Sequence, residues 1–254
     1  MDEQAEYSVL SKAAYDYFHG GRSLAQTELQ EYGLGGYGID AALSDDRAVV
    51  ITRPDGSAVV SYRGTDHLSD LVPDFQIALG YHQNPWLQSI GAAAAYLASD
   101  RFTDARERFS KAKAKHNNVS VTGHSLGGTL ALHTARSNAG TRAIVFNPGS
   151  TPLAEPFHAA YCSTYDCGYT VKQRIYSTGY DPISLSSYLF DGATDDVIPV
   201  EPKDTGDYLS HGLVHFLPRR RMGEHPAYLD PVFLPSGERV PFCQLFPELC
   251  PLGS

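Results

Sequence analysis

Apolar positions follow helical spacing in some segments of the chain and strand spacing in others. Residues 6–19 carry apolar side chains every three or four positions, which predicts an amphipathic helix that ends at Gly20 and Gly21. Two runs rich in β-branched residues, 48–52 and 58–62, flank a Pro-Asp-Gly-Ser turn and predict a β-hairpin. Later segments predict a helix at 86–98, a strand at 119–121, a helix at 126–137, and strands at 142–147 and 173–177. Strands that alternate with helices predict the α/β class, with a mostly parallel central sheet flanked by helices.

The last 37 residues of the sequence are unusually rich in proline. Residues 218–254 contain seven of the 16 prolines, and proline lacks the amide that helices and central strands need. We therefore predict a single domain over residues 1–254, on which residues 218–254 lie as an extended, proline-rich strap.

The charge composition limits the classes of partner that the chain is expected to bind. The 20 Lys and Arg residues are outnumbered by 29 Asp and Glu, and the resulting net charge of -9 argues against nucleic acid and against electrostatic adsorption to anionic lipid. No apolar run reaches the length of a transmembrane segment, so none is expected. The sequence begins with acidic residues where a secretory leader is basic and then apolar, so we expect a cytoplasmic location. The cysteine pairs 162/167 and 243/250 are then expected as thiols, and in an oxidising environment they would instead permit two disulfides.

The first candidate for chemistry is the run Gly123-His124-Ser125-Leu126-Gly127. A Gly-x-Ser-x-Gly motif alone occurs by chance, but here a β-branched strand precedes it and an Ala/Leu-rich helix follows. In that context the turn lifts a serine hydroxyl above the sheet edge, and the helix N-terminus directs amide groups at a developing oxyanion. Ser125 is therefore the predicted nucleophile.

A serine nucleophile needs a base and an acid that orients the base. Asp181 follows the strand predicted at 173–177, at the carboxyl end where α/β sheets keep their sites, whereas no clear strand precedes the alternatives Asp195 and Asp196. Downstream, His211 is the preferred base and His215 the alternative. The two histidines are four residues apart, but no third ligand is evident, so we expect neither a metal nor a cofactor.

The oxyanion would need two backbone amides. One belongs to Leu126, the residue after the nucleophile, and a second is expected from a loop after an early strand. The strand at 58–62 runs into Arg63-Gly64-Thr65, a glycine turn that suits this role.

These motifs together resemble the class 3 lipases, the fungal triacylglycerol lipase-like members of the α/β-hydrolase fold. Tyr62-Arg-Gly-Thr65 is similar to the end of the family's oxyanion strand, and Asp74 falls nine residues later, where the family has an aspartate. The run Thr-Gly-His-Ser-Leu-Gly-Gly is the family's nucleophile turn, His124 included. The segment that starts at His211 resembles the family's His-x-Leu-x-x-aromatic-Leu, whose first histidine is catalytic.

The resemblance implies a lipid carboxylic-ester hydrolase that works through Ser125, His211 and Asp181 and an acyl-enzyme. It also implies an oxyanion role for Thr65, a supporting role for Asp74, and a lid within residues 67–86 that makes apolar contact with a lipid surface. Short-chain carboxylesterase activity, phospholipase A1-type activity and a catalytically silent binding protein are the alternatives.

Overall fold

The computed structural model describes residues 1–64, 100–149, 172–178, 197–203, 212–218, 232–233 and 239–240. Several predictions fall outside these residues, namely the helix at 86–98, the lid at 67–86, both cysteine pairs, and Thr65, Asp74, Asp181, Asp195, Asp196 and His211.

A seven-stranded sheet runs through the described part of the chain, and its strands lie side by side in sequence order. They are β1 (Gly38–Ile39), β2 (Ala48–Thr52), β3 (Ala58–Tyr62), β4 (Val119–His124), β5 (Arg142–Phe146), β6 (Lys172–Thr178) and β7 (Val197–Val200). The pairs β1–β2 and β2–β3 are antiparallel, and every later neighbour is parallel. The α/β class and the mostly parallel sheet are therefore confirmed.

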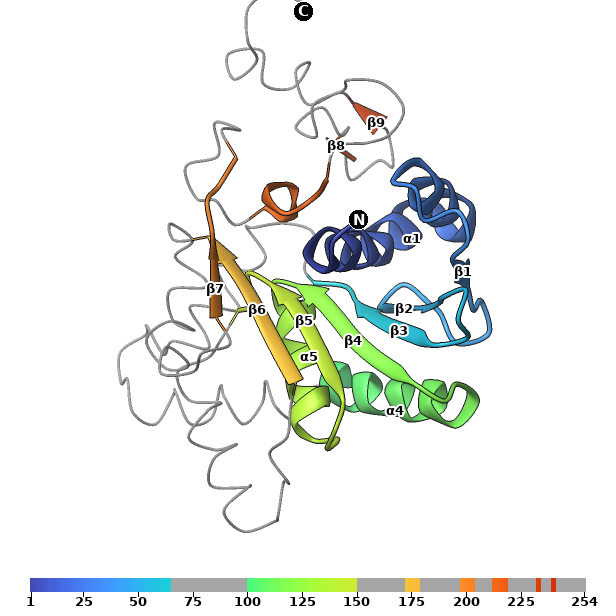
Figure 1. Ribbon diagram of the computed structural model, residues 1–254. Helices are drawn as coiled ribbons and strands as arrows, with labels where there is room; N and C mark the ends of the chain where they lie inside the picture. The colour runs from blue at the N-terminus through green and yellow to red at the C-terminus, as the bar shows by residue number, and fades with distance from the viewer. Residues whose placement is uncertain are drawn as a thin grey trace, which may run out of the picture.

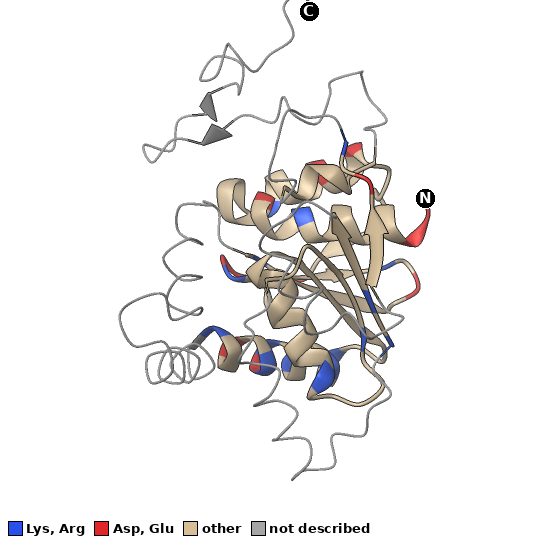
Figure 2. Cartoon of the chain, turned by 90° about the vertical axis from the view of Figure 1, so that its left-hand side faces the viewer, with Lys and Arg blue, Asp and Glu red and all other residues tan. Residues whose placement is uncertain are grey.

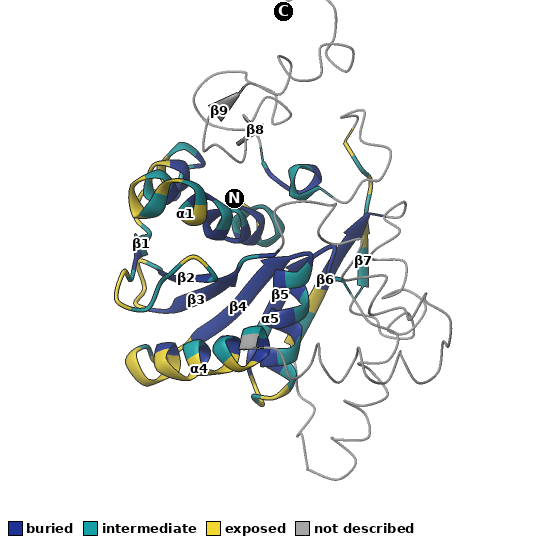
Figure 3. Ribbon diagram, turned by 180° about the vertical axis from the view of Figure 1, so that it is seen from behind, coloured by how far each residue is buried: buried dark blue, intermediate teal, exposed yellow. Residues whose placement is uncertain are grey.

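Helices cover both faces of the sheet (Figure 1). Helix α1 (Glu3–Glu31) packs on one face, and α4 (Asp100–Lys115) and α5 (Leu126–Arg136) pack on the other. Alternate residues of β5 divide between the two cores, since Ile144 packs with the α1 side while Val145 packs with the α4 and α5 side. Strands β2 to β5 are thus buried along nearly all of their length, and exposed residues lie on the outer surfaces of the helices, in loops, and on β6 and β7 near the edge of the sheet (Figure 3).

Helix α1 is longer than the sequence predicted. Gly20 and Gly21 do leave helical geometry, with Gly21 at φ 66° and ψ -165°, but helix resumes beyond them and continues to Glu31. An ion pair between Lys12 Nζ and Glu28 Oε2, 3.1 Å apart, joins the two halves across the kink. The glycine pair therefore does interrupt the helix where the local pattern placed its end, and what the sequence analysis missed is the second helical segment, which this contact between distant residues attaches to the first.

The predicted hairpin is confirmed, with β2 and β3 paired from Ala48 opposite Tyr62 to Thr52 opposite Ala58. The charged segment after residue 100 is helix α4, whose apolar positions face the sheet: Phe102, Ala105, Phe109 and Ala112. None of the helices in the described ranges is long and apolar enough to cross a membrane.

The sequence analysis missed the short strands. Strand β7 contains Pro199, and proline is compatible with strands mainly at sheet edges or bulges, so its pattern is weak. In the proline-rich tail, β8 (Val232–Phe233) pairs with β9 (Arg239–Val240) in a separate two-stranded antiparallel sheet. The single domain and the surface strap remain predictions.

Candidate active site at the strand–helix turn

Ser125 alone connects β4 to α5, as the sequence predicted. Its backbone has φ 57° and ψ -128°, a left-handed conformation that a side chain rarely adopts and that costs about 1–3 kcal/mol. Backbone hydrogen bonds hold it there: the Ser125 amide donates to Phe146 O at 3.1 Å, and Ser125 O accepts from the amides of Thr129 (3.1 Å) and Gly149 (3.3 Å). The strain is therefore built into the fold.

The glycines of the motif are required by close backbone approach. A Cβ at Gly123 would collide with the carbonyl group of Gly127, one turn along the chain. A Cβ at Gly127 would collide with the Tyr62 carbonyl group and would stand 3.0 Å from the carbonyl carbon of Arg63, at the end of β3. Helix α5 thus starts in direct contact with the end of β3 and with Arg63, the residue that follows it.

The Ser125 side chain is completely buried, and no described group hydrogen-bonds its Oγ. A buried hydroxyl without a partner costs about 1–3 kcal/mol, and such groups require an explanation such as a catalytic role. The hydroxyl precedes the first turn of α5, where unpaired amides favour negative charge. This arrangement suits a nucleophile whose attack generates an oxyanion.

A tyrosine that the sequence analysis did not select contacts both loops of the site. Tyr15 Oη lies 3.1 Å from His124 Nδ1 and 3.4 Å from the His124 carbonyl oxygen, and it accepts a hydrogen bond from the Gly64 amide at 3.2 Å. His124 itself is only 8% exposed. Tyr15 thereby joins α1 to the ends of β3 and β4.

Parallel pairing brings the carboxyl ends of several strands to the edge that holds Ser125. In the register, His124 is opposite Phe146, Phe146 is opposite Tyr176, and Tyr176 is opposite Ile198. Immediately beyond this row, Asn147 Oδ1 accepts a hydrogen bond from the Thr178 amide at 2.9 Å and ties β5 to β6.

A family model for the Tle-like phospholipase domain, described as phospholipase-like, matches residues 6–155. The chain belongs to this family. The match covers α1, the β3 end and the Ser125 turn, and it identifies a lipase- or phospholipase-type lipid hydrolase rather than the class 3 lipases specifically. No curated protein matches the chain significantly.

The phospholipase-like match ends before Asp181 and His211. The described segments that adjoin these two residues therefore provide the structural information about this part of the site. Residues 212–218 contain the 3₁₀ turn η1 (Leu213–His215), and they pack at the same sheet edge. The ring of Phe216 lies 5.1 Å from that of Phe146, and Phe216 O accepts a hydrogen bond from Ser8 Oγ at 3.1 Å. His215 lies in η1 and is 2% exposed.

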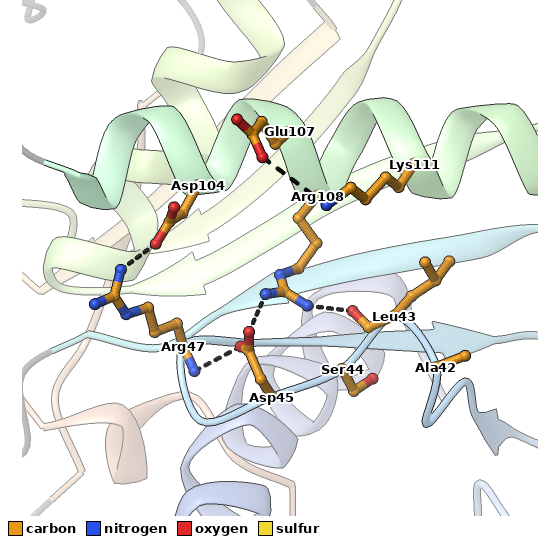
Figure 4. A pocket seen from close by; sticks show the side chains of 9 residues that line it. All are labelled: Ala42, Leu43, Ser44, Asp45, Arg47, Asp104, Glu107, Arg108 and Lys111. Atoms are coloured by element: carbon orange, nitrogen blue, oxygen red, sulfur yellow. Dashed lines mark hydrogen bonds and ion pairs between the residues drawn. The ribbon is translucent and has the colours of Figure 1, made fainter.

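A hollow of about 410 Å³ between residues 42–47 and α4 has a different chemistry (Figure 4). Ion pairs link its walls, between Arg47 and Asp104 and between Arg108 and Asp45. Charged side chains follow the length of this outer helix (Figure 2): its acidic residues lie in the first half, among arginines, and its second half has only basic charges after Arg108. A hollow with six charged side chains is a poor environment for an acyl chain. We therefore interpret its ion pairs as structural contacts that fix α4 on the loop of residues 42–47.

Tyr62, at the end of β3, anchors α4 at the site. Its phenol is buried, which raises the pKa of Tyr62, so the hydroxyl stays protonated and donates to Ala105 O at 2.9 Å. The start of α4 is fixed as well, since Arg101 donates to Arg63 O at 2.6 Å. The turn that follows β3 is thereby held from α1 and from α4.

Proposed function

We propose that this phospholipase-like chain hydrolyses the acyl ester bonds of lipids, phospholipids above all, with Ser125 as nucleophile, His211 as base and Asp181 as acid. The observation that carries the proposal is the strained, buried Ser125, whose hydroxyl has no partner among the described residues. The family match supports a phospholipid as substrate.

The sheet register supports Asp181 over Asp195 and Asp196. Strand β6 ends at Thr178, three residues before Asp181 and at the edge where Ser125 lies. Strand β7 starts at Val197, opposite Ile175, so Asp196 directly precedes the amino end of that strand. At about 3.3 Å per residue, the start of β7 lies several ångströms back from the edge that carries the nucleophile.

The packing of η1 supports His211 as the base. Gly212 directly follows His211, and the residues after it are fixed at the carboxyl end of β5 by the contact between Phe216 and Phe146. Phe146 pairs with His124, the residue before the nucleophile. The anchoring of residues 212–218 supports a base that directly precedes them, whereas His215 lies within η1 and is itself buried.

The reaction follows from these roles. His211 takes the Ser125 proton as Oγ attacks the ester carbonyl carbon, and Asp181 orients the imidazole and stabilises its cationic form. The amides of Leu126 and Thr65 bind the oxyanion, each contributing about 3–4 kcal/mol to the transition state. The C–O bond to the leaving alcohol breaks and His211 protonates that alcohol. Water then attacks the acyl-enzyme through the same base, releasing the fatty acid and restoring Ser125.

Three further elements belong to the proposal. Asp74 supports the Thr65 loop, residues 67–86 act as the lid and provide apolar contact with a lipid surface, and residues 218–254 form the strap on a single domain. Neither a metal nor a cofactor enters the mechanism.

The test compares wild type with Ser125→Ala on phosphatidylcholine micelles, triolein emulsion and p-nitrophenyl esters of short and long chains. Ser137→Ala, the same change at the exposed far end of α5, is the matched control. We expect fatty acid release from phospholipid by wild type and the control, and fluorophosphonate labelling that maps to Ser125. Equal rates for wild type and Ser125→Ala would refute the nucleophile, and activity on short esters alone would identify a carboxylesterase.

The same assay separates the alternatives for acid and base. His211→Ala and Asp181→Asn should lose activity by several orders of magnitude, as members of a catalytic triad do. His215→Asn and Asp196→Asn should retain most of it. Activity that survives the loss of His211 but not of His215 would reverse the choice of base.

A further inference from the structure

Tyr15 stands where the two halves of the expected oxyanion hole meet. Its hydroxyl accepts the Gly64 amide proton at 3.2 Å and has two acceptors within reach on His124: Nδ1 at 3.1 Å and the backbone oxygen at 3.4 Å. Gly64 immediately precedes Thr65, and His124 immediately precedes Ser125. A single phenol therefore bridges the loop after β3 and the turn after β4.

The loop after β3 lies directly against Tyr15 and the Ser125 turn. A Cβ at Gly64 would stand 2.5 Å from Tyr15 Oη, 2.6 Å from His124 O and 3.3 Å from Ser125 Cβ. Contacts this short are tighter than side chains tolerate, so Gly64, the phenol and the Ser125 turn are packed directly against one another.

The bridge does not depend on the protonation of His124. The phenol has one proton, and His124 offers it two acceptors, Nδ1 and the backbone oxygen. With Nδ1 unprotonated, the hydroxyl donates to the ring; with Nδ1 protonated, the ring donates to Oη and the hydroxyl turns to the carbonyl oxygen. In either state the hydroxyl holds the Ser125 turn and still accepts from Gly64.

Helix α1 is itself firmly placed. Ala13 and Ala14 beside Tyr15 are each 1% exposed, so this turn of the helix is packed on the sheet. One turn later, Phe18 lies under the guanidinium of Arg63, 3.8 Å from its ring centroid. The helix thus contacts the loop after β3 at two consecutive residues, Arg63 and Gly64.

We propose that Tyr15 is a positioning residue for ester hydrolysis: it holds the peptide units from which the amides of Thr65 and Leu126 reach the oxyanion. The inference rests on the proposed function. Tyr15 touches neither the substrate nor the reacting atoms, so it acts on the geometry of the transition-state contacts. Misplacement of such contacts by a fraction of an ångström to one ångström lowers the rate by up to about a hundredfold.

The experiment compares Tyr15→Phe with Tyr7→Phe. Tyr7 lies on the same helix and its Oη is 2.9 Å from Ser120 Oγ, so the control also loses one phenol contact to β4, but at the far end of the strand. The readouts are kcat and KM on a p-nitrophenyl ester, the melting temperature, and the affinity for an alkyl boronic acid, which forms a tetrahedral anionic adduct with serine.

For Tyr15→Phe we expect a kcat lowered at least about tenfold, a KM within about twofold of wild type, and weaker boronic acid binding by the same factor as kcat. For Tyr7→Phe we expect kcat within about twofold and a comparable fall in melting temperature. Unchanged kcat in Tyr15→Phe, or losses of kcat that follow melting temperature equally in both variants, would overturn the inference. A wild-type protein that neither hydrolyses esters nor reacts with fluorophosphonate would instead refute the proposed function.

Discussion

Replacement of Gly127 by alanine tests whether close backbone contact, rather than helix propensity, determines the residue at this position. The new Cβ would meet the Tyr62 carbonyl oxygen and would stand 2.9 Å from the Tyr62 carbonyl carbon and 3.0 Å from that of Arg63. Ordinary contacts begin near 3.4 Å, and the contact with the Tyr62 oxygen is the shortest of the three, so the start of α5 has to move by about an ångström or more. All three neighbours are backbone atoms of β3 and its turn, and no rotamer change can relieve the overlap.

The adjacent glycine provides the matched control. A Cβ at Gly128 would meet Pro148 Cβ at 3.1 Å and Gly123 O at 3.2 Å, which a shift of a few tenths of an ångström relieves. Both substitutions gain about 1 kcal/mol of helix propensity. Overpacking costs about 1–3 kcal/mol, with the backbone clash at the upper end or beyond. Gly127→Ala should therefore lower the free energy of unfolding by about 2 kcal/mol, and Gly128→Ala should stay within about 1 kcal/mol of wild type.

Urea unfolding followed by far-ultraviolet circular dichroism measures the difference. For a chain of this length, about 2 kcal/mol corresponds to a melting temperature lowered by about 4–8 °C. Ester hydrolysis by Gly127→Ala should also fall, because the Leu126 amide moves with the helix. A Gly127→Ala variant that unfolds at or above the wild-type urea midpoint would refute the reasoning, as would a Gly128→Ala variant that is equally destabilised.

Three further changes test other parts of the site and its support. Ser125→Gly should be more stable than Ser125→Ala by about 1 kcal/mol in thermal unfolding, since glycine relieves the positive φ that alanine retains. Asn147→Ala should lower the free energy of unfolding by about 2 kcal/mol, since it removes the acceptor of the buried Thr178 amide, while Asn147→Asp should lower it less. Burial raises the pKa of Asp40, but hydrogen bonds, led by that from Lys115, outweigh it and lower the pKa overall. The Asp40 contribution is therefore present above the ordinary aspartate pKa and is lost as pH falls through the lowered value, so urea midpoints of wild type and Asp40→Asn should differ at neutral pH and converge in acid.

Local patterns were enough to predict much of the fold. The hairpin at residues 48–62 was identified because its turn residues and its two β-branched runs are contiguous. The same holds for β4, Ser125 and α5, because a strand, a glycine-flanked serine and a helix follow one another directly. The second half of α1 was missed, since its attachment depends on the contact of Lys12 with Glu28 across a glycine pair that locally signals a stop.

The residues that support the site from a distance could not be predicted from local sequence patterns. Tyr15 occupies an ordinary helical position, and its partners Gly64 and His124 are 49 and 109 residues away. Asn147 follows a predicted strand, but its significance comes from Thr178 on the next strand. The packing of α1 on the sheet brings Tyr15 to its partners, and the register of β5 with β6 brings Asn147 to Thr178, and neither can be deduced from the local sequence.

The proposed nucleophile differs from the proposed acid and base in how the sequence specifies its position. The geometry of Ser125 depends on adjacent glycines and on backbone hydrogen bonds such as that to Phe146 O, so a short motif specifies it nearly completely. An acid and a base belong to loops that are distant from Ser125 in the sequence. For these two residues the sequence specifies only the order along the chain, not the position in space. The fold supports the proposed order in two ways: β6 ends beside β5 at the sheet edge where Ser125 lies, and Phe216, within the segment 212–218 that follows His211, packs on Phe146 at the end of β5. The assignments of Asp181 and His211 therefore depend on the topology, and the paired variants at positions 181, 196, 211 and 215 test the topology as directly as they test the chemistry.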